Sequence, residues 1–142
     1  MRLPAWQRRS FHGVCGVLFV SGVAWLAAHF FLRPVNEFGV AVNPLEPWSM
    51  KLHGAAAMAV LWLVGSMLYL HIRRGLALRR NLLAGWSMIG LLGLLTLTGY
   101  ALYYLAGEDS RPVWSVLHWI AGLLLPALVW LHVRSGRRSL QR

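Results

Sequence analysis

Four long apolar segments run through this 142-residue chain and restrict what it can fold into. They cover residues 11–32, 52–72, 82–104 and 113–133, and none of them contains an Asp, Glu, Lys or Arg. Each is close to the roughly 20 residues that an α-helix needs to cross a bilayer core. Because backbone groups in lipid must bond to one another, each segment is predicted to be a helix. With 58% hydrophobic and 13% charged residues, the composition argues against an ordinary soluble enzyme.

The connections between these segments are short, so successive helices are expected to be antiparallel neighbours. The predicted fold class is therefore all-α, a transmembrane four-helix up-and-down bundle that forms a single domain over residues 1–142. The longest connection, residues 33–50, contains three prolines that interrupt any helix, and the stretch 46–49 is interpreted as the start of the second helix. The first segment is longer than the apolar part of a signal peptide, and no small-residue cleavage site follows it. We therefore expect it to be a retained helix.

Basic residues are distributed unevenly around the four segments. The N-terminal tail, the connection between the second and third segments and the C-terminal tail carry three, four and four arginines, whereas all four acidic residues lie on the opposite side. Positive residues favour the cytoplasmic side of a membrane, which predicts that both termini are cytoplasmic. Topology and contacts with lipid headgroups thus explain the net charge of +10, and nucleic acid is not an expected partner.

Six histidines in so apolar a chain point to chemistry. All of them lie in or at the ends of the first, second and fourth segments, and the third has none. Ionisable residues inside a membrane are costly and are functional candidates by default, although a histidine at a helix end can also cap the helix or lie at the interface. The six are His12, His29, His53, His71, His118 and His132.

Helical spacing places these histidines on shared faces. His118 and His132 are 14 residues apart, so at about 100° per residue they lie within roughly 40° of each other and about 21 Å apart along the axis. His53 and His71 are 18 residues apart, which is five whole turns and about 27 Å. Antiparallel packing then gives two levels in the membrane. The inner level holds His12, His71 and His132, the outer level holds His53 and His118, and His29 is assigned to the outer interface, away from these faces.

Each level offers enough imidazoles to bind a metal centre from two sides. Zinc prefers four ligands, often with cysteine or carboxylate, whereas each level here offers histidines and no acid. Two imidazoles that bind a haem iron from opposite faces fit the pattern better. An iron with both axial positions occupied in this way transfers electrons and has no open position for a substrate. The chain has one cysteine and no Cys-x-x-Cys-His motif, so the haem is predicted to be non-covalent and b-type.

Glycines next to several histidines agree with the close approach of a macrocycle. Gly13 and Gly54 directly follow a histidine, and Gly16 and Gly122 lie one turn beyond one. Glycine also lets membrane helices pack closely, and this alternative remains open.

Three segments carry a family resemblance that covers about residues 8–136. They are Ser10-Phe11-His12-Gly13 at the start of the first apolar segment, Leu52-His53-Gly54 at the start of the second, and the pair of histidines on the fourth. In these segments the chain resembles the bacterial cytochrome b561-like membrane proteins and the cytochrome b subunits of formate dehydrogenases and nickel–iron hydrogenases. The third helix of that family has no ligands, and the third segment here has no histidine.

The resemblance implies two b-type haems in a bacterial inner-membrane protein. His12 and His132 would hold the inner haem, and His53 and His118 the outer one, which agrees with the grouping by depth. His71 departs from the family pattern and is kept as an alternative inner ligand or as a partner of a haem propionate.

Three functions are compared. The leading hypothesis is a di-haem cytochrome that passes electrons between a quinone pool or a membrane donor and another redox protein. It would work as an electron-transfer subunit of a larger oxidoreductase complex rather than as a stand-alone enzyme, with membrane lipid around it and quinone as a further candidate ligand. The alternative is a cofactor-free membrane scaffold or assembly subunit, in which histidines join helices. A transporter is less favoured, because the segments contain no carboxylate.

Overall fold

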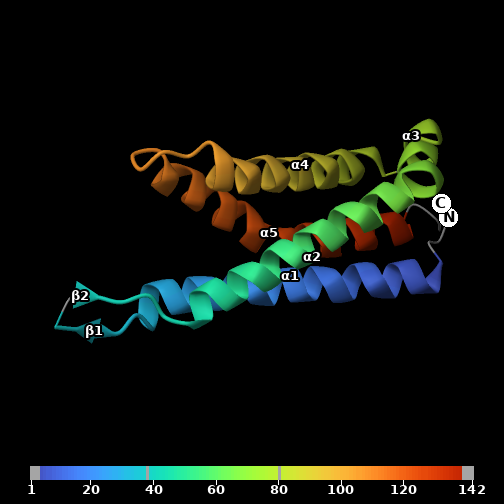
Figure 1. Ribbon diagram of the computed structural model, residues 1–142. Coiled ribbons are helices and arrows are strands. Elements are labelled where there is room, and N and C mark those ends of the chain that lie inside the picture. Colours follow the sequence, from blue (N-terminus) through green and yellow to red (C-terminus); the bar gives the residue numbers. More distant parts are fainter. Residues whose placement is uncertain (1–3, 38, 80, 139–142) are drawn as a thin grey trace. The chain divides into compact units, whose positions relative to one another are not determined.

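The computed structural model describes residues 4–37, 39–79 and 81–138, and in these it is helical apart from one small β-hairpin (Figure 1). The chain divides into two compact units, one ending at Leu68 and the other starting at Tyr69. The first unit contains α1 (Ala5–Phe31), β1 (Val35–Asn36), β2 (Gly39–Val40) and α2 (Leu45–Met67). α2 continues into the π-helical turn η1 (Leu68–Arg73), and α3 (Arg74–Ala77), α4 (Leu82–Tyr104) and α5 (Arg111–Arg138) follow.

Four of these helices, α1, α2, α4 and α5, are long and apolar enough to cross a membrane. The predicted helical segments are thereby confirmed, and the bounds of α4 coincide with the predicted residues 82–104. Large apolar side chains cover the outside of these helices, with Leu83 84% and Leu97 70% exposed. Such a surface is expected where lipid, rather than water, surrounds a helix.

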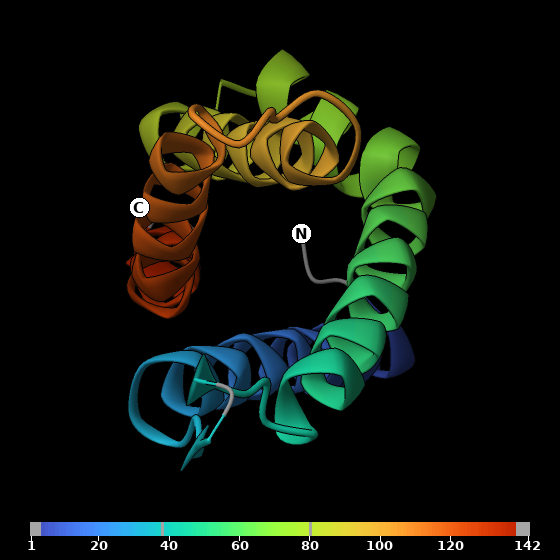
Figure 2. The ribbon, with the colours of Figure 1, turned by 60° about the vertical axis from the view of Figure 1, so that its left-hand side comes forward.

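α1 and α2 form an antiparallel helical hairpin, in which the two helices are in contact and cross at an angle (Figures 1 and 2). Near the start of α1, the Gln7 amide donates to the Ser66 hydroxyl near the end of α2 at 3.4 Å. At the other end, the Asn43 amide donates to the Leu32 carbonyl at 2.7 Å. Among the described residues of this unit, the buried apolar side chains are Ala28, Ala56, Val60, Leu63 and Met67.

A short β-hairpin lies in the connection between α1 and α2, where the sequence predicted only an irregular, proline-interrupted stretch. Val35 pairs with Val40 and Asn36 with Gly39, whose φ of +106° is one that glycine adopts without strain. The chain then turns into α2. The backbone N–H of Leu45, the first residue of this helix, donates to the side-chain oxygen of Asn43 at 2.9 Å. The predicted start of the second helix around residues 46–49 is confirmed, because α2 begins at Leu45.

α4 and α5 form a second antiparallel hairpin. The Asn81 side chain, just before α4, donates to the His132 carbonyl near the end of α5 at 3.2 Å. The small buried residues Ala101 and Ala121 let the two helices approach closely. Pro126 lies inside α5, and the helix continues through it.

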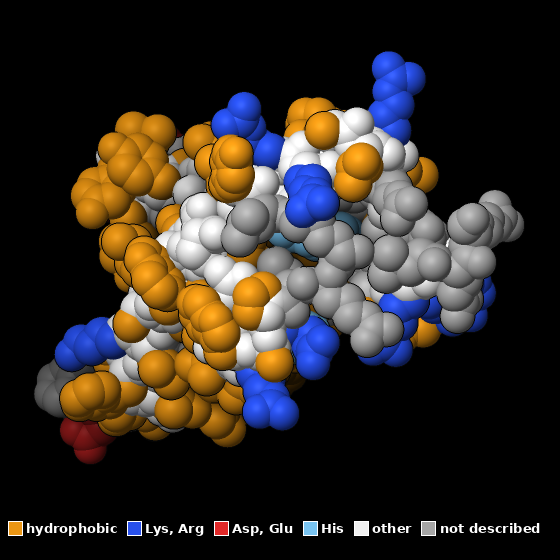
Figure 3. All heavy atoms as spheres, turned by 90° about the vertical axis from the view of Figure 1, so that its right-hand side faces the viewer, with side chains coloured by type: hydrophobic (Ala, Val, Ile, Leu, Met, Phe, Trp, Pro, Cys, Tyr) orange, Lys and Arg blue, Asp and Glu red, His pale blue; other side chains and the backbone are white. Residues whose placement is uncertain are grey.

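Most of the described basic residues of this second unit lie at one end of it, whereas Arg111 lies at the other end, where α5 begins. Arg73 and Arg74 lie where η1 meets α3, and the last turns of α5 carry three more, Arg134, Arg137 and Arg138. Figure 3 shows Lys and Arg side chains standing out from the face it presents. Such a cluster at one end of a pair of apolar helices is the distribution expected next to a membrane surface.

The turn η1 differs from the regular helix that the sequence predicts up to residue 72. Residues 68–73 are π-helical, so the helix locally makes wider turns, and His71 lies within them. A single π-helical turn of six residues is too short to show a period of its own, and hydropathy alone therefore does not indicate one. Such turns occur often at functional positions.

Candidate functional site

In the first unit, the imidazole of His53 on α2 is held against α1. Its Nδ1 atom lies 2.9 Å from the Leu18 carbonyl and 3.2 Å from the Ser21 hydroxyl. Because a carbonyl oxygen can only accept, the Nδ1 atom must carry the proton. The ring also lies over Gly22, where a Cβ atom would come within 3.1 Å of it.

In the second unit, His118 on α5 is held against α4 in a similar way. Its Nδ1 atom lies 2.8 Å from the Thr98 hydroxyl, which in turn lies 2.8 Å from the Leu94 carbonyl. Both contacts are hydrogen bonds when the hydroxyl donates to the carbonyl and accepts from Nδ1–H. The ring lies over Gly99, where a Cβ atom would come within 3.3 Å of it.

His12 makes a hydrogen bond of the same chemical kind within α1. Its Nδ1 atom donates to the Arg8 carbonyl at 2.6 Å, and the side chain is exposed on the helix surface. Together with His53 and His118, it thus carries a proton on Nδ1. In this tautomer the lone pair lies on Nε2, and a backbone or hydroxyl acceptor on Nδ1 is the usual outer partner of a metal-ligating histidine.

His71 and His132 lie together within the second unit. Their rings are in edge-to-face contact with centroids 6.0 Å apart. The Nδ1 atom of His132 is buried and makes no hydrogen bond to any of the described residues. A buried ring nitrogen without a partner is uncommon and requires an explanation, such as a water molecule or a ligand.

The two predicted ligand pairs each take one histidine from each unit. His12 and His53 belong to the first unit, and His132 and His118 to the second. Both pairs would therefore have to form between the units, and they remain predictions. His71, the alternative inner ligand, shares a unit with His132 and contacts it.

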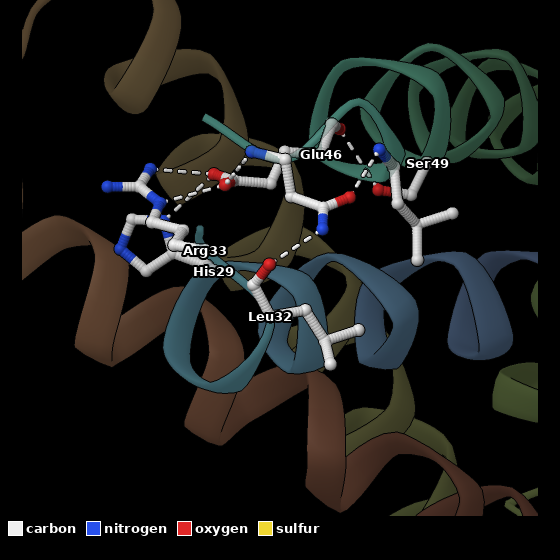
Figure 4. A network of polar contacts seen from close by, with 7 residues as sticks. His29, Leu32, Arg33, Glu46 and Ser49 are labelled. Carbon is white, nitrogen blue, oxygen red and sulfur yellow. Dashed lines mark hydrogen bonds and ion pairs between the residues drawn. The ribbon is translucent and has the colours of Figure 1, made fainter. Parts of the chain in front are cut away.

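His29, assigned to the outer interface from the sequence, takes part in a polar network (Figure 4). Arg33 binds both carboxylate oxygens of Glu46, at 2.8 and 2.7 Å, and the Nδ1 atom of His29 lies 3.0 Å from one of them. The His29 ring also stacks on Trp25, with centroids 4.6 Å apart. Hydrogen bonds to the carboxylate raise the pKa of Arg33, so its charge persists. The network links the end of α1 to the start of α2.

The glycines singled out from the sequence differ from those that contact imidazoles here. Among the described residues, nothing lies within 4 Å of a Cβ placed at Gly13, Gly16 or Gly54. The rings of His53 and His118 instead contact Gly22 and Gly99, each of which follows a hydroxyl residue.

A sequence signal for these contacts exists as a short internal repeat. The stretches Ser21-Gly22-Val23-Ala24 and Thr98-Gly99-Tyr100-Ala101 share a hydroxyl residue, a glycine and an alanine at the same spacing. The two histidines lie in Leu52-His53-Gly54-Ala55-Ala56 and Leu117-His118-Trp119-Ile120-Ala121, which share leucine, histidine and alanine positions. A comparison of the sequence of the first helical pair with that of the second would therefore have indicated both glycines and both histidines.

No family model matches the chain, and no curated protein or solved structure is detectably similar to it. The resemblance to membrane cytochromes b therefore remains a hypothesis.

Proposed function

We propose that the chain is a di-haem b-type membrane cytochrome of the bacterial cytoplasmic membrane, with both termini on the cytoplasmic side. The observation that carries the proposal is the chemistry of the donor set. His12, His53 and His118 each direct Nδ1 to an oxygen of the protein, at 2.6 to 2.9 Å. That arrangement favours the tautomer whose Nε2 atom would be available to coordinate a haem iron.

The residues proposed to hold the two haems are those of the sequence prediction. His53 and His118 would bind the outer haem, and His12 and His132 the inner one, with His71 as the alternative inner ligand. When bound, a haem with two histidine ligands supplies one-electron redox chemistry. The helices contribute an apolar surrounding, and their hydroxyl and carbonyl groups orient the imidazoles. The proposed partners are a quinone or another redox subunit, in addition to lipid.

The decisive experiment is a pyridine-haemochrome assay and a redox-titrated visible spectrum of the purified full chain. We expect two protohaems per chain. His118→Leu and His53→Leu should each remove the outer haem and about half of the absorbance. His29→Leu is the matched control, because that histidine bonds to Glu46 and is not a proposed ligand. Well-folded protein without protohaem would contradict the proposal.

A cofactor-free membrane scaffold is the second candidate, and one observation favours it. The bonds of His53 to α1 and of His118 to α4 each join two helices, which is also how polar residues hold membrane helices together. A scaffold would tolerate His118→Gln, which keeps a hydrogen-bonding group near Thr98. A cytochrome would lose its outer haem with the same substitution, so one variant separates the two functions.

A further inference from the structure

The two helical hairpins hold a histidine by the same construction. In each, the first helix offers a hydroxyl residue followed by glycine, and the second helix offers the imidazole. We call these pairs the niches: Ser21–Gly22 on α1 receives His53, and Thr98–Gly99 on α4 receives His118. The separation in sequence between niche and histidine differs in the two hairpins, so the likeness does not come from equal loop lengths.

The hydroxyl of each niche acts on the Nδ1 atom. The Thr98 hydroxyl donates to the Leu94 carbonyl and the Ser21 hydroxyl to the Leu18 carbonyl, at 2.8 and 3.0 Å. Each hydroxyl proton is thereby directed to its own helix, and the oxygen lone pairs are turned towards the imidazole. The ring is held as the Nδ1–H tautomer, rather than being allowed to choose between its two nitrogens.

The glycine of each niche lets the ring reach that oxygen. A Cβ atom at Gly22 would lie 3.1 Å from the Cε1 atom of His53, and one at Gly99 would lie 3.3 Å from the Cε1 atom of His118. Both separations are shorter than an ordinary carbon–carbon contact. Alanine at either position would push the ring away from the oxygen that orients it.

We propose that the two niches are matched positioning devices that orient His53 and His118 as axial ligands of the outer haem and set its potential. The inference rests on the proposed function and extends it to Ser21, Gly22, Thr98 and Gly99, which are positioning residues. Hydrogen bonding from Nδ1–H makes an imidazole a stronger donor to iron and favours the ferric state. Loss of a niche hydroxyl should therefore raise the midpoint potential of the outer haem and leave that of the inner haem unchanged.

The first test needs no haem. Nitrogen NMR of the full chain, labelled at histidine and kept haem-free, distinguishes the two imidazole tautomers by their ring-nitrogen shifts, and His118→Gln assigns the signal. We expect His118 to be in the Nδ1–H form in the parent and in Thr98→Ser, and to move towards the other tautomer in Thr98→Val. Thr96→Val is the matched control, because among the described residues the Thr96 hydroxyl donates to the Leu92 carbonyl of its own helix. An unchanged His118 signal in Thr98→Val would overturn the proposal. Thr98→Ala is the second variant if the valine form does not fold.

The second test is a redox titration of the haem-loaded chain. Thr98→Val should raise the potential of the outer haem, Thr98→Ser should restore it, and Thr96→Val should match the parent. Ser21→Ala should act in the same direction but more weakly, because the Leu18 carbonyl still accepts from His53. A potential that does not respond to Thr98→Val would overturn the tuning role.

The two tests separate the niches from the function on which they rest. If the tautomer of His118 responds to Thr98 but the chain binds no protohaem, the proposed cytochrome fails and the niche remains as a structural device. If protohaem binds with two histidines while tautomer and potential ignore Thr98, the cytochrome stands and the niche proposal fails.

Discussion

The imidazole rings of His71 and His132 contact each other edge to face, with centroids 6.0 Å apart and ring planes at 78°. This contact joins His132, a predicted ligand of the inner haem, to His71, which is the alternative to His12 as the second inner ligand. It raises the question of which histidine, His12 or His71, shares the inner haem with His132.

We predict that His12→Leu abolishes the inner haem, whereas His71→Leu retains it with an altered spectrum. The reason is that His12 already directs Nδ1 to a backbone carbonyl, as a ligand does, and His71 acts by contact with the ligand His132. Haem content per chain and low-temperature electron paramagnetic resonance measure both effects. Loss of the inner haem in His71→Leu, with retention in His12→Leu, would reverse the assignment.

The helices could be predicted from the sequence because lipid imposes a single solution on an apolar segment of this length. Residues 82–104 illustrate this, since the structure gives the same bounds. The niches could not be predicted in that way. Gly13 is next to a histidine in sequence, whereas Gly22 is next to one in space, and that contact depends on the register of α1 against α2. The register is set by side-chain packing between the helices, which a hydropathy pattern does not describe.

A hydropathy pattern also does not describe the local structure at the ends of the helices. The π-helical turn around His71 lies where the apolar pattern is continuous. The β-hairpin after α1 lies where that pattern is weak. Pairing of Glu46 with Arg33 also depends on the turn geometry between two helices, which a hydropathy pattern does not describe.

Glu46 provides a prediction about stability. Its side chain is 5% exposed and bonds to Arg33, His29 and the backbone N–H of Asn43. Glu46→Gln should lower the free energy of unfolding by about 1–3 kcal/mol, because it removes charge-assisted bonds from a buried group. The control is Glu37→Gln, at an exposed position in the connection between β1 and β2. Unfolding in mild detergent measures both, and equal stabilities would contradict the role assigned to this network.

Membrane orientation is tested with single cysteines in a Cys15→Ser background. A cysteine in place of Arg79 should react with a membrane-impermeant maleimide only from the cytoplasmic side, and one in place of Gly107 only from the opposite side. Both positions are exposed and lie at opposite ends of α4. The expectation follows from the excess of arginine next to the apolar segments on one side. Labelling of both positions from the same side would exclude an odd number of crossings between them.

Gly22 and Gly16 form a matched pair on α1 for testing the close approach of His53. Alanine in place of a helical glycine ordinarily stabilises by about 0.5–1 kcal/mol, and Gly16→Ala should show this gain because no described atom lies within 4 Å of the added methyl group. Gly22→Ala should reverse the sign, with a net loss of about 1–3 kcal/mol, since its methyl group would come within 3.1 Å of a ring that the Leu18 carbonyl and the Ser21 hydroxyl hold in place. Denaturation of the haem-free chain measures the difference without any assumption about the cofactor. Equal gains in the two variants would mean that the imidazole of His53 does not lie against α1.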